Sequence, residues 1–394
     1  MHLSSRIQNI KPSFIREILK VTAQPDAISF AGGLPNKDLF PVEELAAASA
    51  LVFSGHGADA LQYAATEGYA PLKQWIADQY RIRENIEVSP HQIIITNGSQ
   101  QAFDLIGKVL LNEGDALAIE QPGYLGAIQA FSFYRPAWQS IGLTEQGLDV
   151  EDIQKALQQS TKLFYSVPNF QNPTGLSHPN ENRKAVAEVL KGKDCYFIQD
   201  DPYGWIQFSE NRYLNFATLL PEQTILLGSF SKTVVPAFRL GWVVVPTALV
   251  DPFLIAKQAI DLHTNSFCQR VIHEYVSGDR FATNLANVIS SYQAQKQAMV
   301  DAISAKMPKD VQFSDPEGGM FLWLKLPHGL SARGLLDYCM ARKVVFVPGD
   351  TFYIGAEDGC EIRMNYSCLS AEKIREGVQI MADGINQLLA KQAS

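Results

Sequence analysis

Residues 93–111 read IIITNGSQQAFDLIGKVLL, and this stretch decides the fold class. An apolar run rich in β-branched residues comes first, an Asn-Gly turn follows, and the remainder has the apolar spacing of a helix. A strand that is apolar on both faces is typical of a parallel sheet covered by helices. The same order of apolar run and helical segment recurs at residues 116–133 and 162–190. The stretch therefore predicts βαβ units.

Six strands and three helices are predicted in this part of the chain. The strands are Ile93–Thr96, Ala116–Glu120, Lys162–Val167, Tyr196–Gln199, Thr224–Gly228 and Trp242–Val245, and the helices are Gln100–Leu111, Leu125–Phe133 and Asn180–Leu190. Alternation of strands and helices indicates an α/β fold with a doubly wound, mostly parallel sheet.

The chain beyond residue 279 has a different pattern, which favours a smaller α+β domain. A long helical segment is followed by three short strands and two helices: Asp279–Lys306, then Phe321–Leu326, Val344–Val347 and Cys360–Asn365, with Ala332–Arg342 and Ala371–Leu389. We therefore expect an N-terminal segment, residues 1–44, that packs on the rest and on the active site. A large domain would span residues 45–278, and a small C-terminal domain residues 279–394.

The composition is that of a globular protein with an acidic balance. Of 394 residues, 46% are hydrophobic, and 41 Asp and Glu outnumber 33 Lys and Arg, which gives a net charge of −8. This balance argues against a nucleic-acid binder, because such a protein carries a basic face. The longest apolar stretch, residues 240–250, contains Gly241 and Pro246 and is too short to span a bilayer.

The cysteines, the histidines and the first residues bear on location and metal binding. Five scattered cysteines contain no C-x-x-C pair, which fits reduced thiols of the cytosol. Seven histidines form no H-E-x-x-H motif, so we expect no metal site. The first residues, MHLSSRIQNI, lack the apolar core of a signal peptide. We predict a cytoplasmic protein that binds neither nucleic acid nor membrane.

Polar residues follow four of the predicted strands at the point where each strand ends. The segments are TNGSQQA at 96–102, PNFQNPTG at 168–175, FIQDDPYG at 197–204 and GSFSKTVVPAFRLGW at 228–242. Ligands of doubly wound sheets bind beyond the carboxyl ends of the strands. We therefore expect the four segments to converge on one site.

Two of these segments suit a bound anion and a presented amide. Ser99 and Gln100 begin a helix after Gly98, where free N–H groups and the helix dipole attract an anion. A plain N-cap without a ligand explains the same residues. Pro173 excludes a helix at Asn172, so a rigid turn can present the Asn172 amide, although a plain loop explains it too.

The other two segments carry a pair of carboxylates and a lysine. Asp200 and Asp201 end an apolar strand, where an acid is costly unless it meets a cation, a metal or a helix end. Lys232 follows a strand directly, and a lysine at a buried strand end can lose its charge and become a nucleophile. A solvated surface lysine is the alternative. The polar residues beside this lysine suit a phosphate: Ser229, Ser231 and Arg239.

Together, an anion site, an asparagine turn, a buried acid and a lysine match a pocket for pyridoxal 5′-phosphate (PLP). The sequence resembles the fold-type I PLP-dependent aminotransferases of class I and II, above all the branch of 2-aminoadipate and kynurenine aminotransferases. MocR-type regulators carry a domain of the same kind. The resemblance extends from PSFIRE at 12–17 and AGGLPN at 31–36 to IRMNYS at 362–367. It implies a fold-type I large domain and PLP as the cofactor.

The resemblance implies a role for each matching residue around the cofactor ring. Lys232 would bind PLP covalently and later move a proton, and Asp200 would keep the ring nitrogen protonated. Asn172 and Tyr203 would contact the phenolic oxygen of the ring, and Tyr124 would stack on the ring. Lys232, Asp200 and Tyr203 are the predicted catalytic residues.

Further residues match the phosphate site and the substrate site of the family. The phosphate would be held by Ser99, Gln100, Ser229, Ser231 and Arg239, with Tyr63 of the neighbouring subunit. Arg363 would bind the substrate α-carboxylate beside Asn172, because its planar fork suits that group. Gly33 and Leu34 would form a loop on the substrate side. Arg16 stands where relatives have a mobile arginine for a side-chain carboxylate, and a solvated surface arginine is the alternative.

The expected activity is transfer of an amino group between an L-amino acid and a 2-oxo acid. We expect 2-oxoglutarate as the acceptor, ping-pong chemistry, a role in amino acid metabolism and a homodimer with shared active sites. A lyase, decarboxylase or racemase would use the same pocket, because the bond that breaks depends on substrate orientation. A MocR-like regulatory module would need a DNA-binding domain before residue 31, and about 30 residues are too few for one.

Overall fold

The computed structural model describes residues 3–8, 26–327, 329–355 and 359–392. A sheet of eight strands forms its centre, in the order β2-β9-β8-β7-β6-β3-β4-β5. The strands are β2 (Ile93–Thr96), β3 (Ala116–Gln121), β4 (Ala137–Thr144), β5 (Gly147–Leu148), β6 (Leu163–Ser166), β7 (Tyr196–Asp200), β8 (Thr224–Ser229) and β9 (Gly241–Val244). Strands β8, β7, β6, β3 and β4 run parallel, while β9 is antiparallel to both β2 and β8, and β5 is antiparallel to β4.

This sheet confirms the predicted α/β fold class. All six predicted strands are present, and their ends differ from the prediction by one residue at most. Strands β4 and β5 were not predicted. The sequence of β4, AWQSIGLT, alternates between exposed and buried residues, so it lacks the continuous apolar run that marks the central strands.

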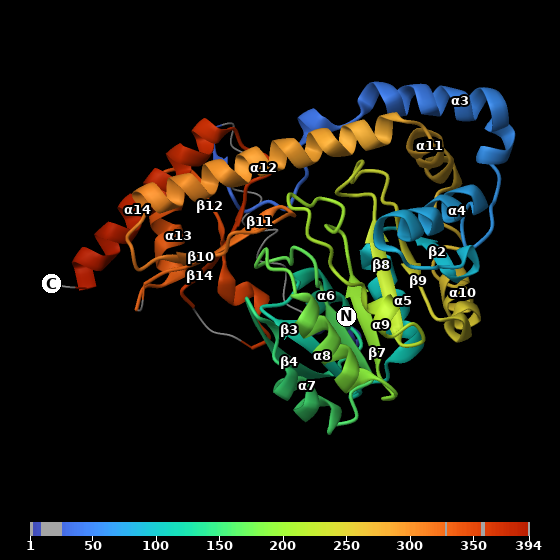
Figure 1. The fold of residues 1–394 in the computed structure, drawn as a ribbon, viewed down its shortest axis with the longest axis horizontal. Helices are drawn as coiled ribbons and strands as arrows, with labels where there is room; N and C mark the ends of the chain where they lie inside the picture. Colours follow the sequence, from blue (N-terminus) through green and yellow to red (C-terminus); the bar gives the residue numbers. More distant parts are fainter. Residues whose placement is uncertain (1–2, 9–25, 328, 356–358, 393–394) are drawn as a thin grey trace.

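Helices cover both faces of this sheet (Figure 1). They are α4 (Ala70–Gln79), α5 (Ser99–Leu110), α6 (Leu125–Ser132), α7 (Val150–Leu157), α8 (Asn180–Leu190), α9 (Phe216–Leu219), α10 (Val250–Gln258) and α11 (Ser266–Val276), while α3 (Val42–Ala60) packs on the outer side of α11. Along β8, Ile225 and Leu227 pack in one apolar cluster with Ile106 of α5, while Leu226 packs in another with Ile272 of α11. Neighbouring residues of a strand face opposite sides, which explains why these strands are apolar throughout.

The C-terminal part contains an antiparallel sheet of order β10-β11-β14-β13. Its elements are α12 (Arg280–Lys306), β10 (Gln312–Phe313), β11 (Phe321–Lys325), α13 (Ala332–Met340), β12 (Val344–Val345), β13 (Val347–Pro348), β14 (Glu361–Asn365) and α14 (Ala371–Gln392). Helix α12 runs along the molecule from α11 to α14 (Figure 1). This α+β architecture agrees with the expected character of the C-terminal part, while the two predicted boundaries, at 44/45 and 278/279, stay predictions.

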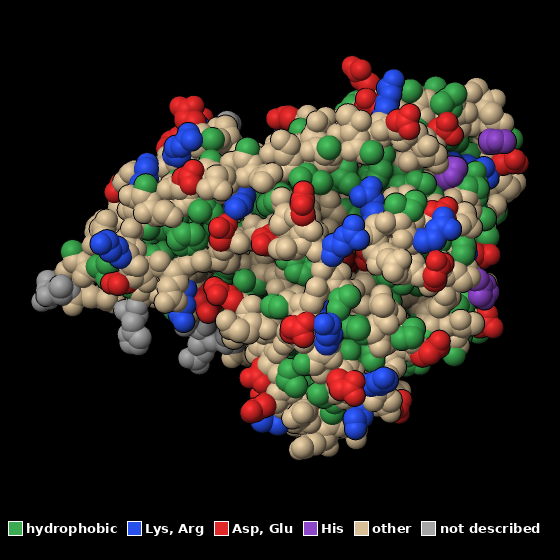
Figure 2. All heavy atoms as spheres, viewed as in Figure 1, with side chains coloured by type: hydrophobic (Ala, Val, Ile, Leu, Met, Phe, Trp, Pro, Cys, Tyr) green, Lys and Arg blue, Asp and Glu red, His purple; other side chains and the backbone are tan. Residues whose placement is uncertain are grey.

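The N-terminal stretch joins this part through β1 (Ile28–Ser29), which pairs in parallel with β12. The remaining short elements are α1 (Ser5–Gln8), η1 (Lys37–Leu39), η2 (Tyr80–Glu84), η3 (Pro90–Gln92), η4 (Thr247–Leu249) and η5 (Gly349–Phe352). Basic and acidic side chains are interspersed on the face seen in Figure 2. Within the described ranges, no helix is long and apolar enough to cross a membrane.

Candidate active site

Lys232 lies just beyond the carboxyl end of β8, in a position that withdraws its amine from water. Its Nζ donates a hydrogen bond to the carbonyl oxygen of Gly33 at 2.8 Å. Burial, and then the positive charges of Arg363 and Arg239, lower the Lys232 pKa to about 8. A larger share of the amine is therefore neutral near neutral pH, which is the form that attacks a carbonyl.

Asp200 ends β7, the strand beside β8, and only 1% of its surface is exposed. Its Oδ2 accepts a hydrogen bond from the Tyr165 hydroxyl at 2.7 Å. Its Oδ1 is buried and has no hydrogen-bond partner among the described residues. Burial raises the pKa of Asp200 to about 7, since a lone carboxylate is poorly stabilised there. The free oxygen fits a ligand that brings a positively charged N–H group, as the PLP ring nitrogen would.

An anion site forms where α5 begins. Gly98 precedes the helix with φ of +73°, and a Cβ there would lie 2.7 Å from Nη2 of Arg239. The guanidinium therefore lies beside the residue that precedes this twelve-residue helix, and the guanidinium and the free N–H groups of the first turn both attract an anion. Nearby, the buried Ser229 accepts a hydrogen bond through Oγ from the backbone N–H of Ser231 at 3.1 Å. These groups suit a phosphate.

Two predicted phosphate contacts lie on the first turn of α5. Ser99 is half-buried at the first position of the helix. Gln100 is exposed, and its Nε2 donates to the carbonyl oxygen of Gly126 at 3.1 Å. The Gln100 side chain is thus engaged with α6, and a phosphate would meet its backbone N–H group first.

Arg363, in β14, brings a buried cation from the C-terminal sheet to the same place. Its Nη1 donates to Oδ1 of Asn172 at 3.0 Å, and its Nη2 donates to the carbonyl oxygen of Ala31 at 2.6 Å. The guanidinium lies 4.5 Å from the ring centre of Phe321 and 5.1 Å from that of Phe352. Burial lowers the Arg363 pKa to about 10, so the group remains charged at pH 7. A fixed planar cation of this kind suits a carboxylate.

The two predicted tyrosines lie close to these groups. Tyr203 is buried, it interacts with the Asn172 side chain, and burial raises its pKa. Tyr124 immediately precedes α6, and burial together with the charge of Asp200 raises its pKa to about 12. Both phenols therefore stay protonated at neutral pH and can donate hydrogen bonds.

Other predicted residues lie apart from this group. Leu34 is exposed, and its carbonyl oxygen accepts a hydrogen bond from the Ser367 hydroxyl at 2.9 Å. Tyr63 is 79% exposed and meets the His263 ring edge-on at 5.9 Å, so it is not among the side chains gathered around Lys232. Arg16 lies outside the described residues.

Sequence reasoning missed Tyr165, the partner of Asp200. The strand register offers a signal, because Tyr165 pairs with Ile198 and therefore points to the same face as Asp200, two residues further on. Phe321 and Phe352, whose rings both lie beside the Arg363 guanidinium, were missed as well. Their contacts join segments far apart in sequence, and no local pattern marks them.

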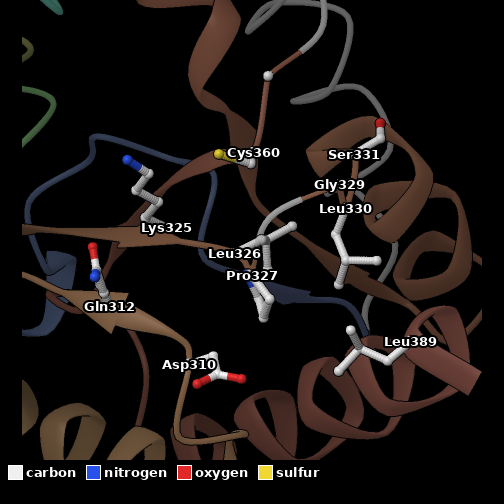
Figure 3. Close-up of a pocket in the computed structure, with 11 residues that line it drawn as sticks. Asp310, Gln312, Lys325, Leu326, Pro327, Gly329, Leu330, Ser331, Cys360 and Leu389 are labelled. Carbon is white, nitrogen blue, oxygen red and sulfur yellow. The ribbon is translucent and has the colours of Figure 1, made fainter. Parts of the chain in front are cut away.

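The cavity shown in Figure 3 lies elsewhere, in the C-terminal part. It measures about 990 Å³ and is lined by Asp310, Gln312, Lys325, Leu326, Pro327, Gly329, Leu330, Ser331, Gly359, Cys360 and Leu389. Figure 3 shows Lys325 and Gln312 on strands at one side and Leu389 on α14 at the other. No predicted site residue lines it. In the described ranges, no three His, Cys, Asp or Glu residues are grouped to hold a metal ion.

Comparison with known proteins agrees with this geometry. A family model described as "Aminotransferase class I and II" matches residues 26–381. Aromatic-amino-acid aminotransferase 1 of Thermococcus litoralis is 36% identical over 397 residues, which cover 99% of this chain and 95% of that protein. A 2-aminoadipate transaminase of Thermus thermophilus is 39% identical over 386 residues, which cover 97% of this chain and 96% of that protein.

A solved structure extends the likeness to three dimensions. The kynurenine aminotransferase of Pyrococcus horikoshii, in complex with PMP, has a TM-score of 0.93 at 36% identity, covering 98% of this chain and 97% of that one. All three relatives are named as aminotransferases, which favours transamination over the lyase, decarboxylase and racemase reactions. Because the match spans nearly the whole chain and the residues around Lys232 fit the cofactor, the chain belongs to the class I and II aminotransferases and transfers amino groups with PLP.

Proposed function

We propose that this aminotransferase moves the amino group of an acidic or aromatic L-amino acid to 2-oxoglutarate by ping-pong chemistry. The relatives named for aromatic amino acids, 2-aminoadipate and kynurenine support this range of donors. The observation that carries the proposal is that Asp200 ends one strand and Lys232 follows the end of the neighbouring strand. One offers an amine of lowered pKa, and the other offers a carboxylate oxygen without a partner among the described residues.

The proposed roles of the ring-side residues follow from their surroundings. When bound, PLP supplies an electron sink for the charge left on a substrate carbon that loses a proton. Lys232 holds the cofactor and then carries that proton, because its amine gains and loses protons near neutral pH. Asp200 stabilises the protonated ring nitrogen through Oδ1, while Tyr165 keeps the carboxylate oriented through Oδ2. Asn172 and Tyr203 donate to the phenolic oxygen of the ring.

The anionic ends of cofactor and substrate are held by separate cations. Arg239 and the start of α5 bind the phosphate, with Ser99, Gln100, Ser229 and Ser231 as further donors. Arg363 binds the α-carboxylate, which every amino and oxo acid carries. Its Nε is buried and has no partner among the described residues, so a donor is available for the substrate.

A homodimer with shared active sites belongs to the same proposal. Large apolar side chains are exposed on α3, on the turn after it and on α10: Leu51, Phe53, Leu61 and Ile255. Such exposure is typical of a surface that meets a partner. The exposed Tyr63 belongs to the same region and is available to the phosphate of a second subunit. We also propose a cytoplasmic location, which the five free cysteines support.

Subunit mixing tests the shared site. Chains with Tyr63→Ala and chains with Lys232→Ala are combined, and exchange is verified by mass spectrometry of differently tagged chains. Some mixed dimers then hold one pocket with both lesions and one pocket with neither. We expect activity above that of either variant alone. Absence of recovery after complete exchange would contradict the shared site.

The donor range is tested in half-reactions. The holoenzyme is mixed with 2-aminoadipate, glutamate, tyrosine or kynurenine, and conversion of the cofactor to its amine form is followed by absorbance. 2-Oxoglutarate is then expected to restore the original spectrum. The Lys232→Ala protein serves as the control that converts nothing. Release of carbon dioxide from the donor, or racemisation of the donor, without conversion of the cofactor to its amine form would overturn the proposal.

A further inference from the structure

We propose that Arg183 is a positioning residue that holds the Asn172 turn and the Tyr203 turn in one arrangement. It acts through Asn169 and Asp201, and it touches no part of the predicted cofactor site itself. This inference rests on the proposed roles of Asn172, Asp200 and Tyr203. It adds Arg183, which contacts none of these three side chains, as a residue that fixes their positions.

Arg183 closes the base of the segment 168–178 that carries Asn172. It lies on α8 and is fully buried. Its Nε donates to the carbonyl oxygen of His178 at 2.8 Å, and its Nη2 donates to that of Pro168 at 2.7 Å. A backbone hydrogen bond from His178 N–H to the Pro168 carbonyl joins the same two residues at 3.0 Å. Both ends of the segment are therefore fixed by one guanidinium.

The tip of that segment lies at the substrate site. There Oδ1 of Asn172 accepts a hydrogen bond from Arg363, the residue proposed to bind the α-carboxylate. The tip is braced from within, because Gln171 accepts a backbone hydrogen bond from Gly175 at 2.6 Å. A shift at the base of the segment would therefore move the whole tip, including the Asn172 amide, as a rigid unit.

A second chain of contacts leads from Arg183 to the end of β7. Its Nη2 also donates to Oδ1 of Asn169 at 2.6 Å, and Nδ2 of Asn169 donates to Oδ2 of Asp201 at 2.6 Å. The other carboxylate oxygen of Asp201 accepts from the backbone N–H of Gly204 at 2.8 Å. The turn from Asp201 to Gly204 contains Tyr203, and it directly follows Asp200. These contacts, which run from Arg183 through Asn169 to Asp201 and are called the relay below, therefore join the segments that follow β6 and β7.

The relay also settles a charge problem. A buried guanidinium is costly unless its charge is balanced, and no carboxylate lies within 4.0 Å of Arg183 among the described residues. The negative charges of Asp201, one side chain away, and of Glu84 both favour the charged guanidinium, and the Tyr213 ring lies 5.0 Å from it. The fourth hydrogen bond goes to the Leu214 carbonyl at 2.7 Å. A lysine retains the charge but cannot make this planar fork of contacts.

The test is a double-mutant cycle with Arg183→Lys and Asn172→Ala. We expect Arg183→Lys to weaken PLP binding to the apoprotein, and kcat/KM with 2-aminoadipate, by about tenfold each. In the Asn172→Ala background the same substitution is expected to cost clearly less than tenfold, because the part of its effect that passes through Asn172 is already lost and only the part that passes through the Tyr203 turn remains. Full multiplication of the two effects would overturn the positioning role. PLP binding is measured by fluorescence quenching, which does not depend on turnover.

Two further variants separate positioning from folding. Asn169→Ala removes the link to Asp201 but leaves the three carbonyl contacts of Arg183, so it remains informative if Arg183→Lys does not fold. It is expected to weaken PLP binding several-fold at unchanged secondary structure; an unchanged dissociation constant would contradict the relay. Lys73→Arg is the matched control, because Lys73 is a buried cation on a different helix, α4, and the substitution conserves its charge. It is expected to leave PLP binding unchanged. Failure of Lys232→Ala to abolish turnover would instead contradict the proposed function.

Discussion

The buried Lys257 and the half-buried Lys232 have different surroundings. Lys257, on α10, is fully buried, and its Nζ lies 2.9 Å from Oδ1 of Asp261 and 3.0 Å from Oγ1 of Thr264. Lys232, after β8, donates to the Gly33 carbonyl, and no carboxylate lies within 4.0 Å of it among the described residues. Burial lowers the pKa of both amines, but the Asp261 carboxylate opposes that effect at Lys257.

The difference separates a structural amine from a reactive one. An amine paired with a carboxylate stays charged and holds its neighbours in place. An amine surrounded by other cations and by a carbonyl oxygen loses its proton more readily and can attack an electrophile. Burial alone therefore does not distinguish the two lysines; the charges of their neighbours do, and they support the reactive role proposed for Lys232.

The largest expected effect comes from Lys232→Ala. Transamination should fall by about 10⁴-fold or more, because this side chain is proposed both to hold the cofactor and to carry the proton. The absorbance of the covalently bound cofactor should disappear, while circular dichroism should show an intact fold. Near-normal turnover in the half-reaction with 2-aminoadipate would contradict the assignment.

Asp200→Ala is expected to have the next largest effect. Without the carboxylate the ring nitrogen loses its stabilising anion, and the half-reaction should slow by about 10²–10⁴-fold. Asp200→Glu, which retains the charge in a displaced position, is expected to lose less. Stopped-flow absorbance measures both rates, and a twofold loss in Asp200→Ala would refute the role.

Lys257→Met tests the structural half of the comparison. Removal of one member of a buried ion pair should lower the free energy of unfolding by about 3 kcal/mol, since Asp261 is left without its cation. Urea denaturation of the apoprotein measures the loss. The effect of this substitution on kcat should be far smaller than that of Lys232→Ala. Unchanged stability would show that the pair contributes nothing.

The smallest expected effect is on pH dependence. Because the Lys232 pKa is about 8, the neutral amine should increase about tenfold between pH 6 and pH 7 and level off above pH 8. The rate at which apoprotein captures PLP should follow this curve. Nα-acetyl-lysine is the control for the titration of PLP itself, and its rate should keep rising toward pH 10. Identical profiles for protein and control would contradict the lowered pKa.

Local sequence patterns predicted six of the eight strands of the central sheet and drew attention to Asp200 and Lys232, whose roles stay predictions. Continuous apolar runs such as IIIT and ILLG marked the buried strands, and Asp200 and Lys232 stood out because charges at the ends of such strands are costly. The half-exposed strand β4 was not predicted, because an alternating, mixed sequence near a sheet edge marks a strand less clearly than a continuous apolar run. The sequence did not single out Arg183, because an arginine among polar residues of a helix is usually solvated, whereas here it is fully buried.

The sequence by itself determined which segments become strands and helices and which polar groups end the strands. Only the tertiary structure decided what each of those groups meets. Tyr165 occupies one oxygen of Asp200, and Arg363 reaches the carbonyl of Ala31, 332 residues away. The physical reason is that apolar periodicity is a local property of the chain. Desolvation and hydrogen bonding depend on groups that other strands bring within a few ångströms, and these set the pKa of Lys232 and leave one oxygen of Asp200 open.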